Sequence, residues 1–159
     1  MIVLGIDPGI ALTGWGVVKK SDSPELIKYG CIKTKAGLAS EERLSKIFEQ
    51  LEGVIKKFKP EVVAIEKLFF NTNAKTALSV GEARGVIKLC AVKNSIPITE
   101  FTPLQIKSSV VGYGRADKNQ VQVMVKTLLG LDEVPRPDDA ADAVAVALTY
   151  CFYQKNLEK

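Results

Sequence analysis

The 159-residue sequence contains no histidine. This absence excludes hydrolases that use a Ser-His-Asp or Cys-His arrangement, zinc sites with imidazole ligands, and any imidazole base that titrates near neutral pH. Acid–base or metal chemistry in this chain therefore depends on carboxylates, lysines or cysteines.

Cysteines and long apolar runs are also scarce. Cys31, Cys90 and Cys151 are odd in number and in no Cys-x-x-Cys arrangement, so we expect buried thiols in a reducing compartment. Asp7 interrupts the first apolar stretch, which argues against a signal peptide, and no run approaches the roughly 18 residues of a membrane-spanning helix. We therefore expect a cytoplasmic protein that does not enter a membrane. The length is typical of one domain, predicted to span residues 1–159.

Positive charge is unevenly distributed along the chain, although the overall net charge is only +4. Residues 1–66 carry 10 basic and 9 acidic groups, a net charge of +1. Residues 67–126 carry 9 basic and 3 acidic groups, a net charge of +6, whereas residues 127–159 carry 3 and 6, a net charge of −3. A basic middle segment is compatible with a polyanionic ligand, but a solvated helix face often causes the same imbalance. Charge alone leaves both interpretations open.

The hydrophobic pattern predicts an α/β fold. Strand-like segments cover residues 2–7, 13–18, 26–34, 61–66 and 96–101. Helices are predicted at residues 40–58, 74–94, 103 to about 112, 118 to about 130, and 138–150. This succession indicates a mixed five-stranded sheet flanked by helices, with the first three strands antiparallel.

Two of the apolar strands end on a carboxylate. Asp7 ends the first strand, and Glu66 ends the strand that follows the first helix. Ligands of α/β sheets collect beyond the carboxyl ends of parallel strands, so Asp7 and Glu66 lie side by side if their strands are parallel neighbours. The simpler alternative is that each acid only marks the point where a strand enters a loop.

A second group of carboxylates, Asp138-Asp139-Ala-Ala-Asp142, opens the last helix. Asp139 and Asp142 are three residues apart and share one helix face. Capping and the helix macrodipole account well for Asp138 or Asp139, because both favour acids in a first turn. They account less well for Asp142, because Ala143–Leu148 continues as a helix that is apolar almost all round and therefore typical of a buried helix. A carboxylate buried there requires a cation or several hydrogen-bond donors.

The acids of the two strands and this helix form one candidate site: Asp7, Glu66, Asp139 and Asp142. If they meet at one point, each pair about 4 Å apart repels by about 4 kcal/mol at an effective dielectric constant near 20, so the cluster requires protonation or divalent cations. Hard oxygen ligands without histidine or thiolate favour Mg²⁺ or Mn²⁺ over Zn²⁺. Two such ions can activate a water molecule and stabilise the leaving oxygen of a phosphodiester. The basic middle segment would then contact a DNA or RNA backbone.

Four segments of the sequence stand out as motifs: GIDPG at residues 5–9, AIE at 64–66, VVGYGRADK at 110–118 and DAADA at 139–143. In this order and spacing they resemble motifs of the RuvC family of Holliday junction resolvases. The resemblance extends over essentially the whole chain and implies a ribonuclease H-like fold. It also implies a homodimer, a branch-migration helicase complex as partner, and Mg²⁺-dependent nicking of two symmetric strands of a four-way DNA junction during recombination and repair. Hydrolysis by two metal ions, for which Mn²⁺ can substitute, would leave 5′-phosphate and 3′-hydroxyl ends.

The resemblance also implies roles for individual residues. The four acids of the candidate site match the family's metal-binding catalytic carboxylates. Lys107 and Lys118 match basic positions near the scissile backbone, and Phe69 matches an aromatic residue of the junction-binding loop. An exposed aromatic side chain there can stack on an unpaired base. Arg115 lies in the glycine-rich segment 112–116, between these lysines, and is a further candidate DNA contact, although exposed basic side chains are commonly only solvated.

Other functions are compatible with parts of this pattern. A related ribonuclease H-like nuclease could act on RNA or on other branched DNA, and a catalytically silent module could bind junctions while its acids only cap and solvate. An actin-like or sugar-kinase-like ATPase also begins with an acid after a strand. Such an ATPase needs two of these domains, and 159 residues leave room for one.

A two-fold junction favours a two-fold protein, so we expect a dimer. The helix predicted at residues 74–94 is the candidate interface, because the small residues Gly81, Ala83 and Gly85 permit close approach. Arg84, between the two glycines, is expected to face either the DNA or the partner subunit.

Overall fold

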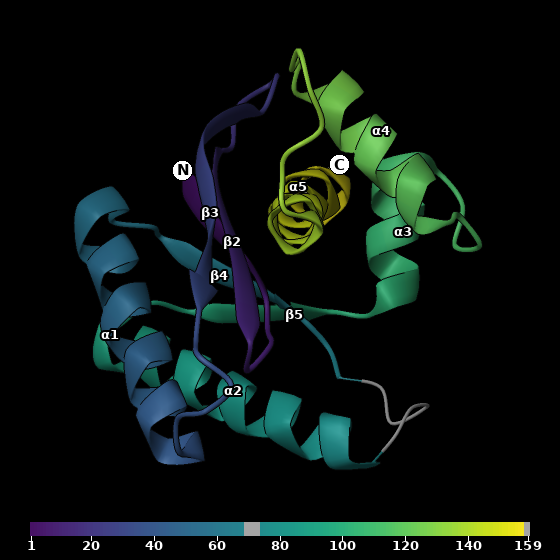
Figure 1. Ribbon diagram of the computed structural model, residues 1–159. Helices are drawn as coiled ribbons and strands as arrows, with labels where there is room; N and C mark the ends of the chain where they lie inside the picture. Colours follow the sequence, from purple (N-terminus) through teal and green to yellow (C-terminus); the bar gives the residue numbers. More distant parts are fainter. Residues whose placement is uncertain (69–73, 158–159) are drawn as a thin grey trace.

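A computed structural model describes residues 1–68 and 74–157 as a sheet with helices on both faces (Figure 1). The strands are β1 (Ile2–Asp7), β2 (Leu12–Lys19), β3 (Glu25–Lys33), β4 (Val62–Glu66) and β5 (Ile98–Phe101). The helices are α1 (Ser40–Phe58), α2 (Ala74–Lys93), α3 (Pro103–Val111), α4 (Lys118–Leu128) and α5 (Asp138–Leu157). All the predicted elements are present. The main differences are that β5 begins only after Pro97, which has no N–H for a strand ladder, and that α5 continues beyond Tyr150.

The sheet has the strand order β3-β2-β1-β4-β5. β1, β2 and β3 pair in antiparallel fashion, whereas β1 pairs in parallel with β4, and β4 with β5. Ile6 lies opposite Ile65 in the β1–β4 pair, so the carboxyl ends of these strands are adjacent. The predicted mixed sheet with an antiparallel start is therefore confirmed, and the parallel pairing of β1 and β4 brings Asp7 and Glu66 to the same edge.

The two faces of the sheet have separate cores because successive side chains of each strand point to opposite faces. Leu4 and Ile6 of β1 pack in one cluster with Ile47 of α1 and Ile87 of α2. Val3 belongs to the other cluster, in which α5 is central and α3 and α4 pack against it. Figure 1 shows α1 and α2 on one side of the sheet and α5, α3 and α4 on the other. Within the described ranges, no helix combines the length and the hydrophobicity that crossing a bilayer requires.

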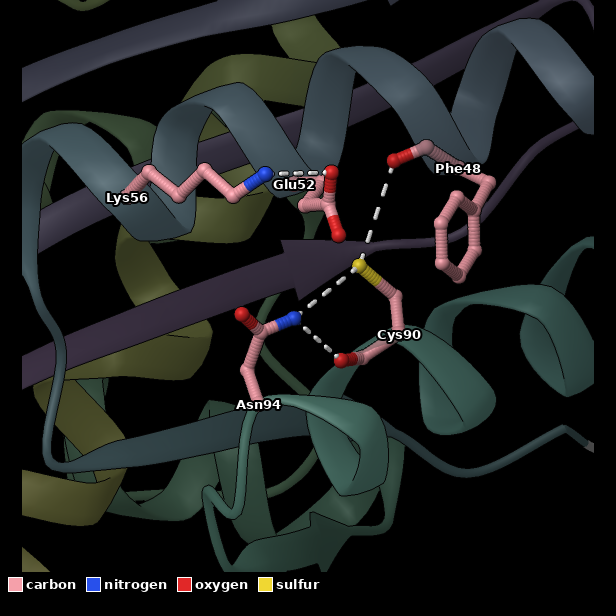
Figure 2. A network of polar contacts seen from close by, with 5 residues as sticks. All are labelled: Phe48, Glu52, Lys56, Cys90 and Asn94. Atoms are coloured by element: carbon pink, nitrogen blue, oxygen red, sulfur yellow. Dashed lines mark hydrogen bonds and ion pairs between the residues drawn. The ribbon is translucent and has the colours of Figure 1, made fainter.

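Polar contacts around Cys90 join the end of α2 to α1 (Figure 2). Asn94 Nδ2 donates to the Cys90 carbonyl oxygen at 2.8 Å, and the Cys90 thiol lies 3.9 Å from the Phe48 carbonyl oxygen. Burial raises the pKa of the Cys90 thiol to about 11, so the side chain stays protonated. Cys90 and Cys151 are buried as predicted. The prediction is wrong for Cys31, which is only partly buried because β3 is an edge strand of the sheet.

Candidate active site

Close packing between the sheet and α5 sets the position of the last-helix carboxylates. Gly14 and Gly16 of β2 and Gly5 of β1 face α5. A Cβ atom at Gly14 would overlap the main-chain carbonyl of Asp139, and one at Gly16 would lie 2.6 Å from Val144 Cγ2. Since α5 is rich in alanine and valine on this side, its backbone lies directly on the strands. Glycines in strands commonly mark such close approach, so Gly5, Gly14 and Gly16 are the sequence signal for this contact.

Asp7 lies at the centre of the group of acids. Burial is the main cause that raises its pKa to about 8, and the charges of Asp142, Glu66 and Asp139 raise it further, in that order. Burial also raises the pKa of Glu66 and of Asp142, and the charge of Asp142 adds to the effect on Glu66. These electrostatic effects link the four acids that the sequence selected, which come from three separate elements, β1, β4 and α5.

Lys118 supplies a positive charge to this group. Its Nζ lies 2.9 Å from Asp142 Oδ2 and 3.7 Å from Asp138 Oδ2. The hydrogen bond to Asp142 is the largest of the effects that raise the pKa of Lys118. Lys118 is the first residue of α4, and its position is fixed by Asp117, whose carboxylate accepts from the Gln120 N–H at 2.9 Å as a helix cap. Asp142 therefore has the cationic partner that its place on a buried helix requires.

Asp138 differs from the four acids of the candidate site, because it also forms an ion pair with Arg136. Both side chains of this pair are substantially exposed. Its place in the first turn of α5 is consistent with the helix-dipole interpretation, whereas the charges of Asp139 and Asp142 act on Asp7 of the sheet.

Two hollows border the acids. The first, of about 200 Å³, is lined by Glu66, Asp142, Lys107 and Lys118 above apolar side chains of α3, α4 and α5. The second, of about 230 Å³, is lined by Asp7, Glu66, Lys67 and Arg84 together with four apolar residues. Glu66 lies between them. Lys107 and Lys118, both predicted to lie near a phosphodiester, thus share one hollow with two of the acids.

The acids fit a hard divalent cation by their chemistry, because all four offer carboxylate oxygens and their mutual repulsion needs a positive charge. In residues 1–68 and 74–157, no three acidic, cysteine or histidine side chains already converge as a metal ligand set. The Lys118 ammonium pairs with one of the four acids, Asp142. The donor set is present and electrostatically coupled, but its side chains are not drawn together.

The sequence profile of the family described as "Crossover junction endodeoxyribonuclease RuvC" matches residues 3–150. The chain belongs to the RuvC family. The RuvC crossover junction endodeoxyribonuclease of Caldanaerobacter subterraneus subsp. tengcongensis is 53% identical over 100% of this chain and 97% of its own length. That of Caldicellulosiruptor saccharolyticus is 54% identical over 94% of this chain and 92% of its own.

Solved structures of the RuvC family have the same fold. The Thermus thermophilus RuvC structure matches with a TM-score of 0.92 at 38% identity and covers 98% of this chain and 96% of that chain. A structure of T. thermophilus RuvC in complex with a Holliday junction substrate matches with a TM-score of 0.93 at 39% identity. These similarities confirm the predicted ribonuclease H-like fold.

Arg115 and Phe69 are the two other predicted DNA-contact residues of this RuvC family member. Arg115 is exposed in the connection between α3 and α4. The predicted stacking residue Phe69 lies outside the residues that the structure describes. Both assignments therefore remain predictions.

Arg84 is buried, so the expectation that it faces DNA or a partner subunit is wrong. Only 8% of its surface is exposed. Its guanidinium donates to the Glu66 main-chain carbonyl and, at 3.1 Å, to Glu100 Oε1 of β5. Sequence reasoning missed this contact, because no local pattern reveals that a helix arginine points at the end of a strand 18 residues earlier.

Proposed function

We propose that this chain is a structure-selective endonuclease that resolves four-way (Holliday) DNA junctions during recombination and repair by nicking two symmetric strands. The observation that carries this proposal is the group of four coupled acids beside Lys107 and Lys118, in a member of the RuvC family. A relative of the same fold that was solved with a Holliday junction supports the choice of substrate.

The proposed cofactor is Mg²⁺, with two ions in each site and Mn²⁺ as a substitute. Asp7, Glu66, Asp139 and Asp142 would hold the ions through their carboxylate oxygens. When bound, the ions supply activation of water and stabilisation of negative charge at the phosphodiester. Burial and the neighbouring carboxylates raise the pKa of Asp7 to about 8, so a cation close to it would restore the charged carboxylate.

The lysines of the first hollow have a proposed role on the DNA backbone. Ammonium groups at Lys107 and Lys118 can pair with non-bridging phosphate oxygens and stabilise the charge that develops during attack. Attack of water on phosphorus releases the 3′-oxygen, and the products carry a 5′-phosphate and a 3′-hydroxyl. Lys118 can exchange Asp142 for phosphate because the lysine side chain is more than half exposed. We place Arg115 and Phe69 among the DNA contacts on the resemblance alone.

The exposed face of α2 supports a homodimer. Leu78, Leu89 and Val92 are 69%, 51% and 65% exposed, and Gly85 lies among them with open space beyond it. Their spacing along α2 places them in one stripe, since residues seven apart return to the same helix face. Ala83, predicted at the interface, is instead buried in the core of its own subunit. Two copies joined along this stripe would place two active sites on a two-fold junction.

Leu89→Glu should convert the dimer to a monomer. A charge at the centre of an apolar helix pair is left without a partner in the interface, which opposes association. Light scattering coupled to size exclusion measures the mass. The matched control is Val123→Glu, at a similarly exposed apolar position on α4, which should remain a dimer. Dimers of unchanged affinity for Leu89→Glu would contradict the interface.

Cleavage specificity tests the proposed function. A labelled four-way junction, a plain duplex and an RNA/DNA hybrid are incubated with the protein, with and without Mg²⁺. We expect paired symmetric nicks in the junction only, and only with Mg²⁺. Efficient cutting of the hybrid would favour a related nuclease acting on RNA, and junction binding without nicks would favour a catalytically silent module.

We also propose, from the resemblance, that this protein works with a branch-migration helicase complex in the cytoplasm. The same resemblance supports a single nuclease domain over residues 1–159.

A further inference from the structure

We propose that Arg84 is a positioning residue for Glu66, because its buried guanidinium takes the place of a missing backbone donor at the end of β4. This inference rests on the proposed function, since it concerns one carboxylate of the same site. It adds a residue from α2 to a site otherwise built from β1, β4, α3, α4 and α5.

The missing donor follows from the strand register. The Lys67 N–H donates to Phe101 on the β5 side, so the Glu66 carbonyl points to the opposite side, toward β1. Ile6 pairs with Ile65 in the parallel ladder of β1 and β4. If this ladder continued, the N–H of residue 8 would donate to the Glu66 carbonyl. That residue is Pro8, which has no N–H to donate. The ladder therefore supplies no hydrogen bond to the Glu66 carbonyl.

Arg84 supplies that bond from α2. Its Nη1 donates to the Glu66 carbonyl, and its Nη2 donates to Glu100 Oε1 at 3.1 Å. Glu100 belongs to β5, on the other side of β4, and also forms an ion pair with Lys88. The fork of the guanidinium thus joins two strands at the edge where the acids gather.

The position of this network makes it relevant to the acids. Arg84, Pro8 and Glu66 line the same hollow as Asp7. Fixing the Glu66 carbonyl fixes the peptide that follows it, and therefore limits the directions in which the Glu66 carboxylate can project. The charge of Arg84 also opposes the rise in the pKa of Glu66. Partners that orient a metal-binding side chain typically affect metal affinity by about 10- to 100-fold.

The test measures metal binding directly, without DNA. The variants are Arg84→Lys, which keeps the charge but lacks the planar fork, and Glu100→Ala, which removes the contact that holds Arg84. The matched control is Lys88→Met, which breaks the Lys88–Glu100 pair and leaves both Arg84 contacts in place. Mn²⁺ is titrated into each protein and free ion is followed by electron paramagnetic resonance. Junction affinity is measured separately in EDTA, and folding by circular dichroism.

We expect Arg84→Lys and Glu100→Ala to bind Mn²⁺ about tenfold more weakly than the unmodified protein, while Lys88→Met stays within about twofold. Junction affinity in EDTA should be the same for all of them. Unchanged Mn²⁺ affinity in folded Arg84→Lys, or in Glu100→Ala if the lysine variant does not fold, would overturn the inference. Weaker junction binding by Arg84→Lys in EDTA would also overturn it, in favour of a DNA contact. If the unmodified protein bound no Mn²⁺, the proposed metal site itself would fail.

Discussion

Asp7→Asn is expected to reduce junction cleavage by about 10³-fold or more and to leave junction binding intact. The amide removes the charge at the centre of the four acids but keeps the size and much of the hydrogen-bonding capacity of the side chain. Cleavage is measured in Mg²⁺ by single-turnover kinetics, and binding is measured in EDTA. The matched control is Asp132→Asn, because Asp132 is an exposed carboxylate outside the proposed ligand set. An active Asp7→Asn protein would contradict the assignment.

The same substitution should stabilise the metal-free protein, most strongly at high pH. The carboxyl of Asp7 loses its proton near pH 3.8 when unfolded and near pH 8 when folded. Between these values the folded state binds more protons than the unfolded state, so the free energy of unfolding decreases as pH rises. The cost at pH 8 is of the order of a few kcal/mol. In EDTA, the melting temperature of Asp7→Asn should therefore increase relative to that of the unmodified protein between pH 5 and pH 8. If Asp7→Asn and the unmodified protein had equal melting temperatures at pH 5 and also at pH 8, the raised pKa of Asp7 would be contradicted.

Gly14→Ala should damage both stability and cleavage, although it adds a single methyl group. The new Cβ would overlap the Asp139 carbonyl, so α5 must move away from the sheet and carry Asp139 and Asp142 with it. Overpacking of this kind costs about 1–3 kcal/mol, and a displacement of about 1 Å at a catalytic group can reduce the rate about 10²-fold. Urea unfolding and junction cleavage measure the two effects.

Gly53→Ala is the matched control for this prediction. Gly53 lies in the middle of α1, and apart from the adjacent residues and the backbone of its own helix no atom lies within 4 Å of a Cβ at that position. Replacement by alanine should stabilise the helix by about 1 kcal/mol and leave cleavage unchanged. A Gly14→Ala protein that behaved like Gly53→Ala would contradict the role of close packing between β2 and α5.

Local periodicity was sufficient to predict the elements of the fold. The apolar strands that end on Asp7 and Glu66, and the apolar helix that follows Asp142, could be read from spacing alone. The adjacency of Asp7 and Glu66 depends on the parallel pairing of β1 and β4. The sequence did not establish this pairing, and the register of the two strands confirms it. The direct contact of α5 with Gly14 could have been inferred from strand glycines opposite an alanine-rich helix.

Orientation about a helix axis was the part that sequence reasoning could not supply. Ala83, Arg84 and Gly85 are consecutive, and the small residues suggested one exposed face. Ala83 and Arg84 are buried, whereas Gly85 is exposed, because each step along a helix turns the side chain by about 100°. Similarly, the ion pair of Lys118 with Asp142 joins α4 to α5 and depends on tertiary packing.

The central claim is that four carboxylates from β1, β4 and α5 form one divalent-metal site. Anomalous diffraction from crystals soaked in Mn²⁺ tests this claim most directly. We predict manganese peaks bonded to the carboxylate oxygens of Asp7 and at least two of the other acids, Glu66, Asp139 and Asp142, with Lys118 displaced from Asp142. Manganese bound elsewhere, or no peak among these acids while Lys118 still pairs with Asp142, would contradict it.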